Sequence, residues 1–377
     1  MFDLTPEQQA LRDMARDFAA AEIAPYALLW DRERHFPVET FRKAAALGMA
    51  AVCVSEANGG SALTRFDSAL VFEALATGCP TVSAFLSIHN LISWAIDRFG
   101  DGAQHALYSQ RLARMELIAS YCLTEPGAGS DAAALTTRAR REGGDYVLDG
   151  VKQFISGGGA SDLYLVMART GGAGAKGISA FLVEKGTPGL SFGPNERKMG
   201  WNAQPTAQVI LEGVRVAAGA RLGAEGDGFK IAMAALDGGR VNIGACSLGG
   251  ADFAMGRALA YAKERKAFGA RIIDFQAQQF RLADMATALE CARALLWRAA
   301  RALDAHAPEA TRLAAMAKRV ATDNGFQVAN DALQIYGGYG YLADTGIEKN
   351  VRDLRVHQIL EGTNDIMRVI VARGMMD

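Results

Sequence analysis

The sequence predicts an α+β protein built from three consecutive parts, the first helical, the second rich in β-strands and the third helical again. Residues 1–118 and 227–377 contain long stretches with apolar residues at helical spacing, whereas residues 119–226 contain short β-branched runs broken by glycine. Helices and strands therefore segregate along the chain, which argues against the alternating order of a doubly wound sheet. A length of 377 residues is enough for two or three domains.

The composition is that of a globular protein without a charge bias. Hydrophobic residues make up 50% of the chain, and 40 Lys and Arg against 41 Asp and Glu give a formal net charge of −1. A nucleic-acid-binding protein usually carries a basic excess or stripe. A membrane-spanning helix needs roughly 20 consecutive apolar residues, and no run approaches that length. We therefore expect neither nucleic acid nor a membrane as a partner.

The cysteines and histidines do not predict a disulfide framework or a metal site. The five cysteines are widely spaced and form no CxxC pair: Cys53, Cys79, Cys122, Cys246 and Cys291. The histidines lack the spacing of metal ligands, so we expect no metal. The N-terminus does not resemble a signal peptide, because acids and amides interrupt its apolar residues. These features favour a cytoplasmic location and leave a processed mitochondrial matrix form open.

The helical parts have recognisable boundaries. Residues 5–8 (TPEQ) predict the start of the first helix, with a capping Thr, Pro at the first helical position and Gln to complete a capping box. Further helices are expected over residues 38–47, 67–77, 81–99 and 104–115, and then over 229–265, 275–305 and 309–336. The last three are long and Ala-rich, which favours a helical bundle that continues across a subunit interface.

The middle part predicts several short strands. Gly143-Gly144 separates residues 132–141 from residues 146–148, which indicates a β-hairpin. Further strands are expected over residues 117–123, 163–167, 178–184 and 207–211.

Two glycine-rich segments do not fit nucleotide-binding motifs. Residues 338–343 match the dinucleotide fingerprint in letters, but they follow a long helix where the motif requires a strand. Residues 171–177 contain a lysine without P-loop spacing, so a hairpin turn is the better interpretation.

The segment 124–131 (TEPGAGSD) is a better candidate for a ligand-binding loop. It follows an apolar strand, its glycines allow a close approach of the backbone, and Thr124 and Ser130 offer hydroxyl groups. Glu125 and Asp131 would repel a free phosphate group. An ordinary turn after a strand explains these residues equally well.

Glu361 is the candidate acid of the C-terminal part. The segment EGTN that it begins lies between apolar residues 356–360 and a helical run over 366–372, and Thr363 or Asn364 could cap that helix. An acid between apolar residues and a glycine can be buried, which would raise its pKa toward that of a general base. The residues alone favour the alternative of a surface acid near a helix cap.

Taken together and in this order, these segments resemble the acyl-CoA dehydrogenase family over essentially the whole chain. The resemblance is carried by residues 121–131 (YCLTEPGAGSD), 154–156 (FIS), 265–269 (RKAFG), 334–338 (QIYGG) and 358–366 (QILEGTNDI). It implies an N-terminal helical domain, a central β-barrel-like domain and a C-terminal four-helix bundle. It also implies a homotetramer built as a dimer of dimers.

The resemblance implies FAD-dependent α,β-dehydrogenation of an acyl-CoA to the 2-enoyl-CoA, with electrons passed to an electron-transfer flavoprotein. Glu361 would remove the α proton while the β hydrogen leaves as hydride to the flavin. The backbone N–H of Glu361 and a flavin ribityl hydroxyl would stabilise the developing enolate. Some branches of the family place the base at the position of Gly239. Glycine has no side chain that could accept a proton, so the resemblance leaves Glu361 as the only candidate base.

The resemblance also implies which residues contact the ligands. Contacts near the flavin ring and the base are implied for Tyr121, Leu123, Thr124, Gly129, Ser130, Phe154, Ile155, Ser156, Thr363, Asn364 and Asp365. Further cofactor contacts are implied for Arg265, Phe268, Phe275, Gln276, Gln334, Gly337 and Gly338. Among these, the segments 265–269 and 334–338 would hold the ADP half of FAD in the neighbouring subunit. Contacts to the CoA portion are implied for Ser130, Asp237, Arg240 and Arg373.

Within the family, the sequence is most similar to the isobutyryl-CoA branch of valine breakdown. The similarity lies in residues 177–179, 184–193, 200–202 and 246–249. We therefore expect a short, branched acyl-CoA as the substrate. The alternatives left open are 2-methylbutyryl-CoA or butyryl-CoA as the substrate, an acyl-CoA oxidase on the same fold, and a non-catalytic helical binding module.

Overall fold

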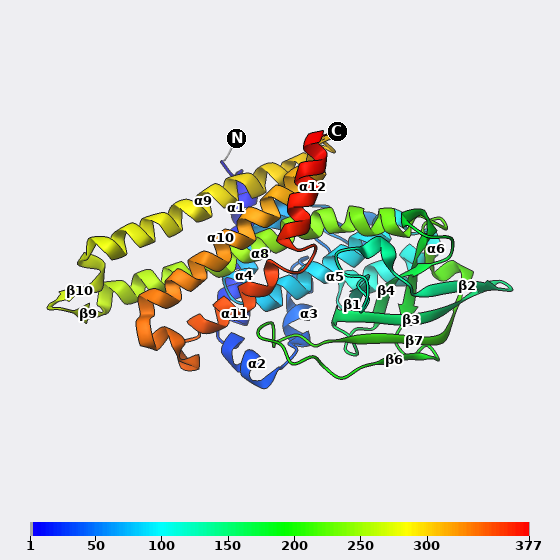
Figure 1. Cartoon of the computed structure of the whole chain (residues 1–377), viewed down its shortest axis with the longest axis horizontal. Helices are drawn as coiled ribbons and strands as arrows, with labels where there is room; N and C mark the ends of the chain where they lie inside the picture. Colours follow the sequence, from blue (N-terminus) through cyan, green and yellow to red (C-terminus); the bar gives the residue numbers. More distant parts are fainter. Residues whose placement is uncertain (1–2, 377) are drawn as a thin grey trace.

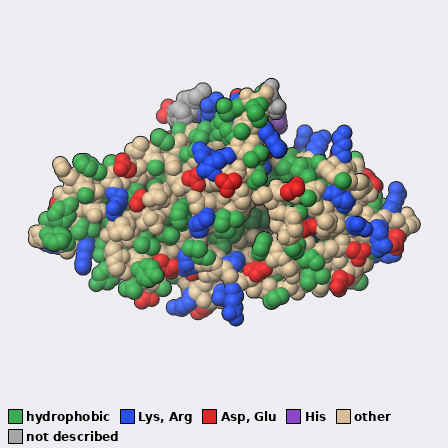
Figure 2. Space-filling model, in the orientation of Figure 1, with side chains coloured by type: hydrophobic (Ala, Val, Ile, Leu, Met, Phe, Trp, Pro, Cys, Tyr) green, Lys and Arg blue, Asp and Glu red, His purple; other side chains and the backbone are tan. Residues whose placement is uncertain are grey.

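The computed structural model of the chain describes residues 3–376 and has the predicted helical, β and helical order (Figure 1). The β-rich part lies at one end of the molecule, and the long helices of the C-terminal part extend toward the opposite end (Figure 1). None of the described helices combines the length and the apolar character needed to span a membrane. On the face drawn in Figure 2, basic and acidic side chains are interspersed.

The N-terminal part is helical, as predicted. Its helices are α1 (Pro6–Phe18), α2 (Ala27–Glu33), α3 (Val38–Ala46), α4 (Arg65–Ala76), α5 (Pro80–Phe99), α6 (Gly102–Gln104) and α7 (Gln110–Ala113). The predicted capping box is present, since the Gln8 N–H donates to Thr5 Oγ1 and the Thr5 N–H donates to Gln8 Oε1. A π-helical stretch, His105–Ser109, joins α6 to α7, so the helix expected over residues 104–115 is continuous but irregular. Helix α2 was not predicted.

The middle part is an eight-stranded sheet with the strand order β6-β7-β3-β2-β4-β5-β8, in which β1 pairs with β4. The strands are β1 (Ala119–Cys122), β2 (Arg138–Glu142), β3 (Asp145–Ser156), β4 (Leu163–Arg169), β5 (Ile178–Glu184), β6 (Leu190–Phe192), β7 (Thr206–Ala217) and β8 (Arg221–Leu222). The expected hairpin is β2 and β3, but residues 132–134 form a 3₁₀ turn and the first strand begins only at Arg138.

One face of the sheet packs around an apolar core of its own, in the part for which a barrel-like domain was expected. Side chains from six strands share this core, among them Cys122, Ala139, Leu148, Val166, Phe181 and Val209. Alternate residues of a strand point to opposite faces, and the other face of β4, with Leu163, Leu165 and Met167, packs against α5 and the third part of the chain. Strand β4 is therefore buried on both faces and fixes the β-rich part to the helices.

The C-terminal part contains α8 (Gly228–Glu264), α9 (Gln276–Asp304), α10 (Ala310–Tyr336), α11 (Ile347–His357) and α12 (Asn364–Met376). A short hairpin of β9 (Lys266–Ala267) and β10 (Ala270–Arg271) joins α8 to α9. Helices α8, α9 and α10 pack against one another, α11 and α12 pack against α10, and α4 of the N-terminal part packs against both α8 and α9. The bundle therefore combines helices from both ends of the sequence.

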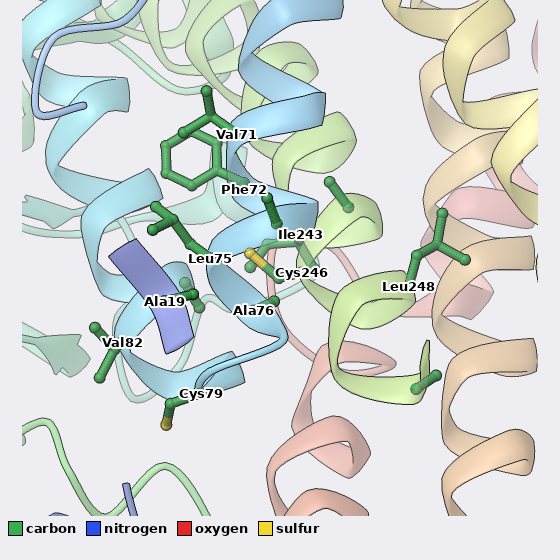
Figure 3. Packing of buried hydrophobic residues seen from close by; sticks show 14 of the residues in the cluster. Ala19, Val71, Phe72, Leu75, Ala76, Cys79, Val82, Ile243, Cys246 and Leu248 are labelled. Carbon is green, nitrogen blue, oxygen red and sulfur yellow. The ribbon is translucent and has the colours of Figure 1, made fainter. Parts of the chain in front are cut away.

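Helices α4 and α8 approach each other closely. Figure 3 shows Leu75 and Ala76 of α4 beside Ile243 and Cys246 of α8. A Cβ on Gly249 of α8 would collide with a backbone carbonyl oxygen of α4 and would lie only 2.8 Å from the Ala76 Cβ. This packing distance therefore depends on a glycine in the middle of a helix.

We predict opposite effects for alanine at two glycines of α8. Gly249→Ala is expected to destabilise the protein by about 1–3 kcal/mol, because the helices must move apart to accommodate the methyl group. Gly256 has open space around its Cβ position, so Gly256→Ala is expected to stabilise by about 0.5–1 kcal/mol through helix propensity alone. Thermal unfolding of both variants checks this prediction, and a raised midpoint for Gly249→Ala would contradict it.

Candidate active site

Glu361 lies where the three parts of the chain meet. It belongs to the loop 358–363, which joins α11 to α12. A Cβ on Gly239 of α8 would collide with Glu361 Oε2 and would lie 3.0 Å from Leu91 Cδ1 of α5. The carboxylate therefore occupies the space that a side chain on residue 239 would need, so a base at one of these positions excludes a base at the other.

Three buried polar atoms near this point have no hydrogen-bond partner among the residues that the structure describes. They are Glu361 Oε2, the hydroxyl of Tyr121 on β1 and Nε of Arg240 on α8. Burial raises the pKa of Tyr121, and the charges of Glu361 and Arg240 act on the same group. Because buried polar atoms in folded proteins are nearly always paired, this cluster marks a place where a ligand would donate and accept hydrogen bonds.

The electrostatics of Glu361 suit a general base. Burial raises the pKa of Glu361 to about 7, against the opposing effect of the positive charges of Lys318 and Arg240. A carboxylate with a pKa near neutrality is a stronger base than an exposed one and is still ionised in a large fraction of molecules at neutral pH.

Arg240 is buried, although a solvated helix face explains most such cations in a sequence. Its Nη1 donates to Asp237 Oδ1 over 2.6 Å, and Asp237 Oδ2 accepts a hydrogen bond from Thr311 Oγ1 over 2.6 Å. The structure thus brings two of the expected CoA contacts, Asp237 and Arg240, together on α8, and Arg240 directly follows Gly239. The other two expected CoA contacts, Ser130 and Arg373, are exposed.

A buried ion pair fixes the loop that follows β1. Glu125 Oε1 accepts hydrogen bonds from Lys152 Nζ over 2.7 Å and from the Thr137 N–H over 2.9 Å, and Oε2 accepts one from the Thr136 N–H over 2.6 Å. Lys152 also donates to the carbonyl oxygen of Leu123. Burial opposes the ionisation of Glu125, but Lys152 and these hydrogen bonds lower its pKa to about 2. Glu125, noted in the sequence only for its repulsion of phosphate, is the anchor of the loop.

The outer side of this loop is open to a ligand. Cβ positions on Gly127 and Gly129 have nothing within 4 Å, and the Thr124 carbonyl accepts a hydrogen bond from the Gln153 N–H, which holds the loop beside β3. The ring of Phe154 is 64% exposed, and its backbone has a φ of 59° in a register shift between β3 and β7. An exposed ring beside open backbone fits a flat aromatic ligand such as a flavin.

The remaining residues expected near the flavin have varied surroundings. Ile155 points into the core of the β-rich part, and Ser156 is half-buried. Thr363 caps α12, because the Ile366 N–H donates to its Oγ1. Asp365 is exposed and forms an ion pair with Arg368.

The side chain of Asn364 is turned toward α10. Its Nδ2 donates to Asp323 Oδ1 over 2.7 Å and to Thr322 Oγ1 over 2.9 Å, and its Oδ1 accepts a hydrogen bond from Lys318 Nζ over 2.9 Å. These bonds attach the beginning of α12 to α10, and a contact between Asn364 and FAD stays a prediction.

A second group of expected cofactor contacts lies at the opposite end of the molecule, near β9 and β10 (Figure 1). It comprises Arg265, Phe268, Phe275, Gln276, Gln334, Gly337 and Gly338. A surface hollow of about 420 Å³ is lined by Arg265, Gly337, Gly338 and Tyr339, among others. At about 1.5 Å per helical residue, the stretch of α8 from Arg240 to Arg265 is roughly 37 Å long. One chain therefore keeps the two groups apart.

Sequence reasoning missed Lys318, a fully buried lysine of α10. A signal was present, because Lys318 follows Ala314 by four residues and precedes Ala321 by three, and both alanines are fully buried. The spacing could be read from the sequence, whereas the burial of this face is seen only in the structure.

A chain of hydrogen bonds around His357 was also missed. Trp201 Nε1 donates to His357 Nε2 over 3.2 Å, and Ser247 Oγ lies 2.6 Å from His357 Nδ1. The Trp201 N–H donates to Asp353 Oδ1 over 2.7 Å. Burial lowers the pKa of His357 to about 3, so the ring is neutral. These bonds tie a loop of the β-rich part to α11, directly before the loop that carries the candidate base.

No cluster of three or more histidine, cysteine or acidic side chains that could hold a metal ion occurs among residues 3–376.

The chain is similar to known proteins over its whole length. The family models for the N-terminal, middle and C-terminal domains of acyl-CoA dehydrogenases match residues 5–116, 120–214 and 226–376. The mitochondrial isobutyryl-CoA dehydrogenase of Bos taurus is 51% identical over 373 residues, which cover 99% of this chain and 90% of that protein.

Two solved structures are similar over nearly their whole length. Butyryl-CoA dehydrogenase from Megasphaera elsdenii has a TM-score of 0.97 and 37% identity. The match covers 100% of this chain and 100% of that one. A chain in a structure described as the electron transferring flavoprotein of Acidaminococcus fermentans has a TM-score of 0.97 and 40% identity, over 100% of this chain and 99% of that one.

The ion pair between Lys152 and Glu125 gives a prediction for stability. Lys152→Met is expected to cost about 3–5 kcal/mol, because it leaves Glu125 buried without its cation. The double variant Lys152→Met/Glu125→Gln is expected to regain part of this loss. Urea unfolding checks both changes, and a double variant as unstable as Lys152→Met would contradict the assignment.

The same pair should make the stability depend on acid. The pKa of Glu125 in the folded protein, about 2, lies below its ordinary value of 4.5. Its contribution is therefore complete above about pH 4.5 and is lost as the pH falls toward 2. Between pH 4.5 and 2, the free energy of unfolding of Glu125→Gln should fall less than that of the unaltered protein. An equal fall in both proteins would contradict the prediction.

Proposed function

The chain belongs to the acyl-CoA dehydrogenase family, and from that premise we propose that it oxidises a short, branched acyl-CoA of the isobutyryl type, with Glu361 as the catalytic base. Dehydrogenation of acyl-CoA thioesters by a flavin-dependent enzyme is the activity of this family. The observation that carries the proposal is the buried Oε2 of Glu361, which has no hydrogen-bond partner within the described part of the chain.

The surroundings of Glu361 explain how it would accept the α proton. Its Oε2 can take up a proton without first breaking a hydrogen bond, and burial has raised its pKa to about 7. Gly239 and Leu91 limit the positions open to the carboxylate, so that it is held in place before the substrate binds. The nearby Arg240 and the hydroxyl of Tyr121 add a charge and a donor, which would favour a thioester oxygen that gains negative charge.

Members of the family depend on FAD, and the residues present fit this group. Thr124, Phe154 and Ser156 would hold the flavin ring, since Phe154 is exposed and the loop that follows Thr124 has open glycine backbone. When bound, FAD accepts the hydride that leaves the β carbon of the substrate. The chain itself supplies position, the base and the exclusion of water.

The second group of contacts supports a shared site between two subunits. Arg265 lies too far from Glu361 along α8 for both to contact one FAD in one chain. The exposed apolar side chains at that end, such as Phe268 at 98% and Tyr341 at 83%, suit burial against another chain. Assembly as a homotetramer, a dimer of dimers, is therefore part of the proposal.

Similarity to named proteins supports the substrate and the electron acceptor. A relative with 51% identity is an isobutyryl-CoA dehydrogenase, which favours a branched four-carbon acyl group. The similarity to a chain described with an electron transferring flavoprotein supports such a protein as the acceptor. A cytoplasmic location and a role in valine breakdown stay predictions from the sequence.

An anaerobic screen tests the substrate. Isobutyryl-CoA, 2-methylbutyryl-CoA, butyryl-CoA, hexanoyl-CoA and octanoyl-CoA would each be mixed with the flavin-loaded enzyme, and the loss of flavin absorbance would be followed. We expect isobutyryl-CoA to give the highest kcat/KM. A higher value for butyryl-CoA would contradict the branched substrate. Rapid reoxidation in air, faster than by an electron-transfer flavoprotein, would instead indicate an oxidase.

Two substitutions test the base. Glu361→Gln should retain FAD and bind acyl-CoA but slow flavin reduction by roughly 10²–10⁴-fold, as expected for loss of a general base. Gly239→Ala should displace the carboxylate and slow the same step by about 10²-fold, because a small misplacement of a reacting group is that costly. The matched control is Gly238→Ala, whose Cβ would meet the movable guanidinium of Arg65. Near-normal rates for Glu361→Gln would exclude it as the base.

A further inference from the structure

Lys318 of α10 is fully buried beside the loop that carries Glu361. Its Nζ donates to the carbonyl oxygen of Gly362 and to Oδ1 of Asn364, both over 2.9 Å. Full burial of a lysine is rare, because the buried ammonium group loses its hydration. Close partners must then compensate for this loss. Both partners follow Glu361 within three residues, so the contacts of this lysine are directed at the position of the candidate base.

The loop needs such support because of its backbone conformation. Glu361 has a φ of 52° and Gly362 a φ of 89°, so two consecutive residues, one of them not glycine, are left-handed. A backbone of this kind persists only where the surrounding structure fixes it. Helix α10 holds the loop at both ends, since Lys318 binds Gly362 and Asp323 Oδ1 accepts a hydrogen bond from Gln358 Nε2 over 2.8 Å.

The titratable groups whose charge acts on Lys318, or on which its own charge acts, lie on α10, α8, α11 and the loop of Glu361. Asp323 lies on its own helix and accepts hydrogen bonds from two amide side chains, and Arg240 of α8 is paired with Asp237. His357 at the end of α11 is neutral. Glu361 in the loop is the remaining charged group, and its Oε2 has no hydrogen-bond partner within residues 3–376. The charge of Lys318 therefore acts mainly on the carboxylate of the base.

We propose that Lys318 is a positioning residue that holds the loop of Glu361 and favours the ionised carboxylate, the form that can accept the α proton. This inference rests on the proposed role of Glu361 as the base. Burial lowers the pKa of Lys318 to about 7, while Glu361 and Asp323 raise it, so the lysine and the base titrate as a coupled pair. Loss of the lysine charge must raise the pKa of Glu361.

The test is the pH dependence of flavin reduction in flavin-loaded Lys318→Met, which removes the charge at similar side-chain volume. The unaltered enzyme should lose activity as the pH falls and Glu361 becomes protonated. In the variant we expect this acidic limb of kcat/KM to move to higher pH by about one unit, equivalent to an additional loss of about tenfold below the limb. At high pH, the rate should recover in part.

Three variants separate charge from structure. Thr322→Val removes a hydrogen bond to Asn364 without a change of charge, so it should lower the rate without moving the limb. Lys318→Arg should leave the limb near its original pH, because it keeps the charge. Lys43→Met removes an exposed lysine of α3 and should change neither the rate of flavin reduction nor the pH of the acidic limb. Flavin content and thermal midpoint would be measured for every variant.

If Lys318→Met retains its flavin and its acidic limb lies at the same pH as in the unaltered enzyme, the proposal is overturned. If that variant loses its flavin, Lys318→Gln, which keeps a donor for Gly362 without the charge, provides the same measurement and the same criterion. Failure of the base assignment gives a different result, since Glu361→Gln would then reduce its flavin at a near-normal rate. An inactive Glu361→Gln together with an unmoved limb would reject only the role of Lys318.

Discussion

The close approach of α8 to its neighbours is the constraint on which the rest of the structure depends. This helix of 37 residues contacts α4, α5, α9, α10 and α11, and two of its closest approaches are possible because the position has no side chain. Gly249 sets the distance to α4, and Gly239 leaves room for the carboxylate of Glu361. Between them the helix is almost completely buried. A base supplied by a distant loop can reach the site because α8 has no side chain at that point.

The class of fold and most elements could be predicted because they depend on local signals. Apolar spacing fixed the long helices to within a few residues, and Gly143-Gly144 marked the hairpin of β2 and β3. Elements that depend on tertiary contacts were not visible. Strands β6 and β8 have only three and two residues, too few for an alternating pattern. The register shift that leaves Phe154 with a positive φ arises from the pairing of β3 with β7. No residue near Phe154 predicts this shift.

The candidate site divides in the same way. Glu361 could be singled out, because an acid between apolar residues and a glycine is a local feature, and Thr363 was one of two expected caps. The groups that determine its chemistry come from elsewhere in the chain, with Arg240 on α8, Lys318 on α10 and Tyr121 on β1. Asn364 illustrates the limit of local reasoning, because its side chain is turned toward α10 by three partners that lie about forty residues earlier.

The length of α8 has a consequence for how faults in this protein would combine. Under the proposed assembly, the base of one site and the residues for the far half of its cofactor belong to different chains. A chain altered at Glu361 and a chain altered at Arg265 would each form inactive assemblies with copies of themselves. Mixed in one dimer, they would form one site with both faults and one site with neither. Two inactive versions of the gene could therefore restore activity to each other, which separate sites within single chains would never allow.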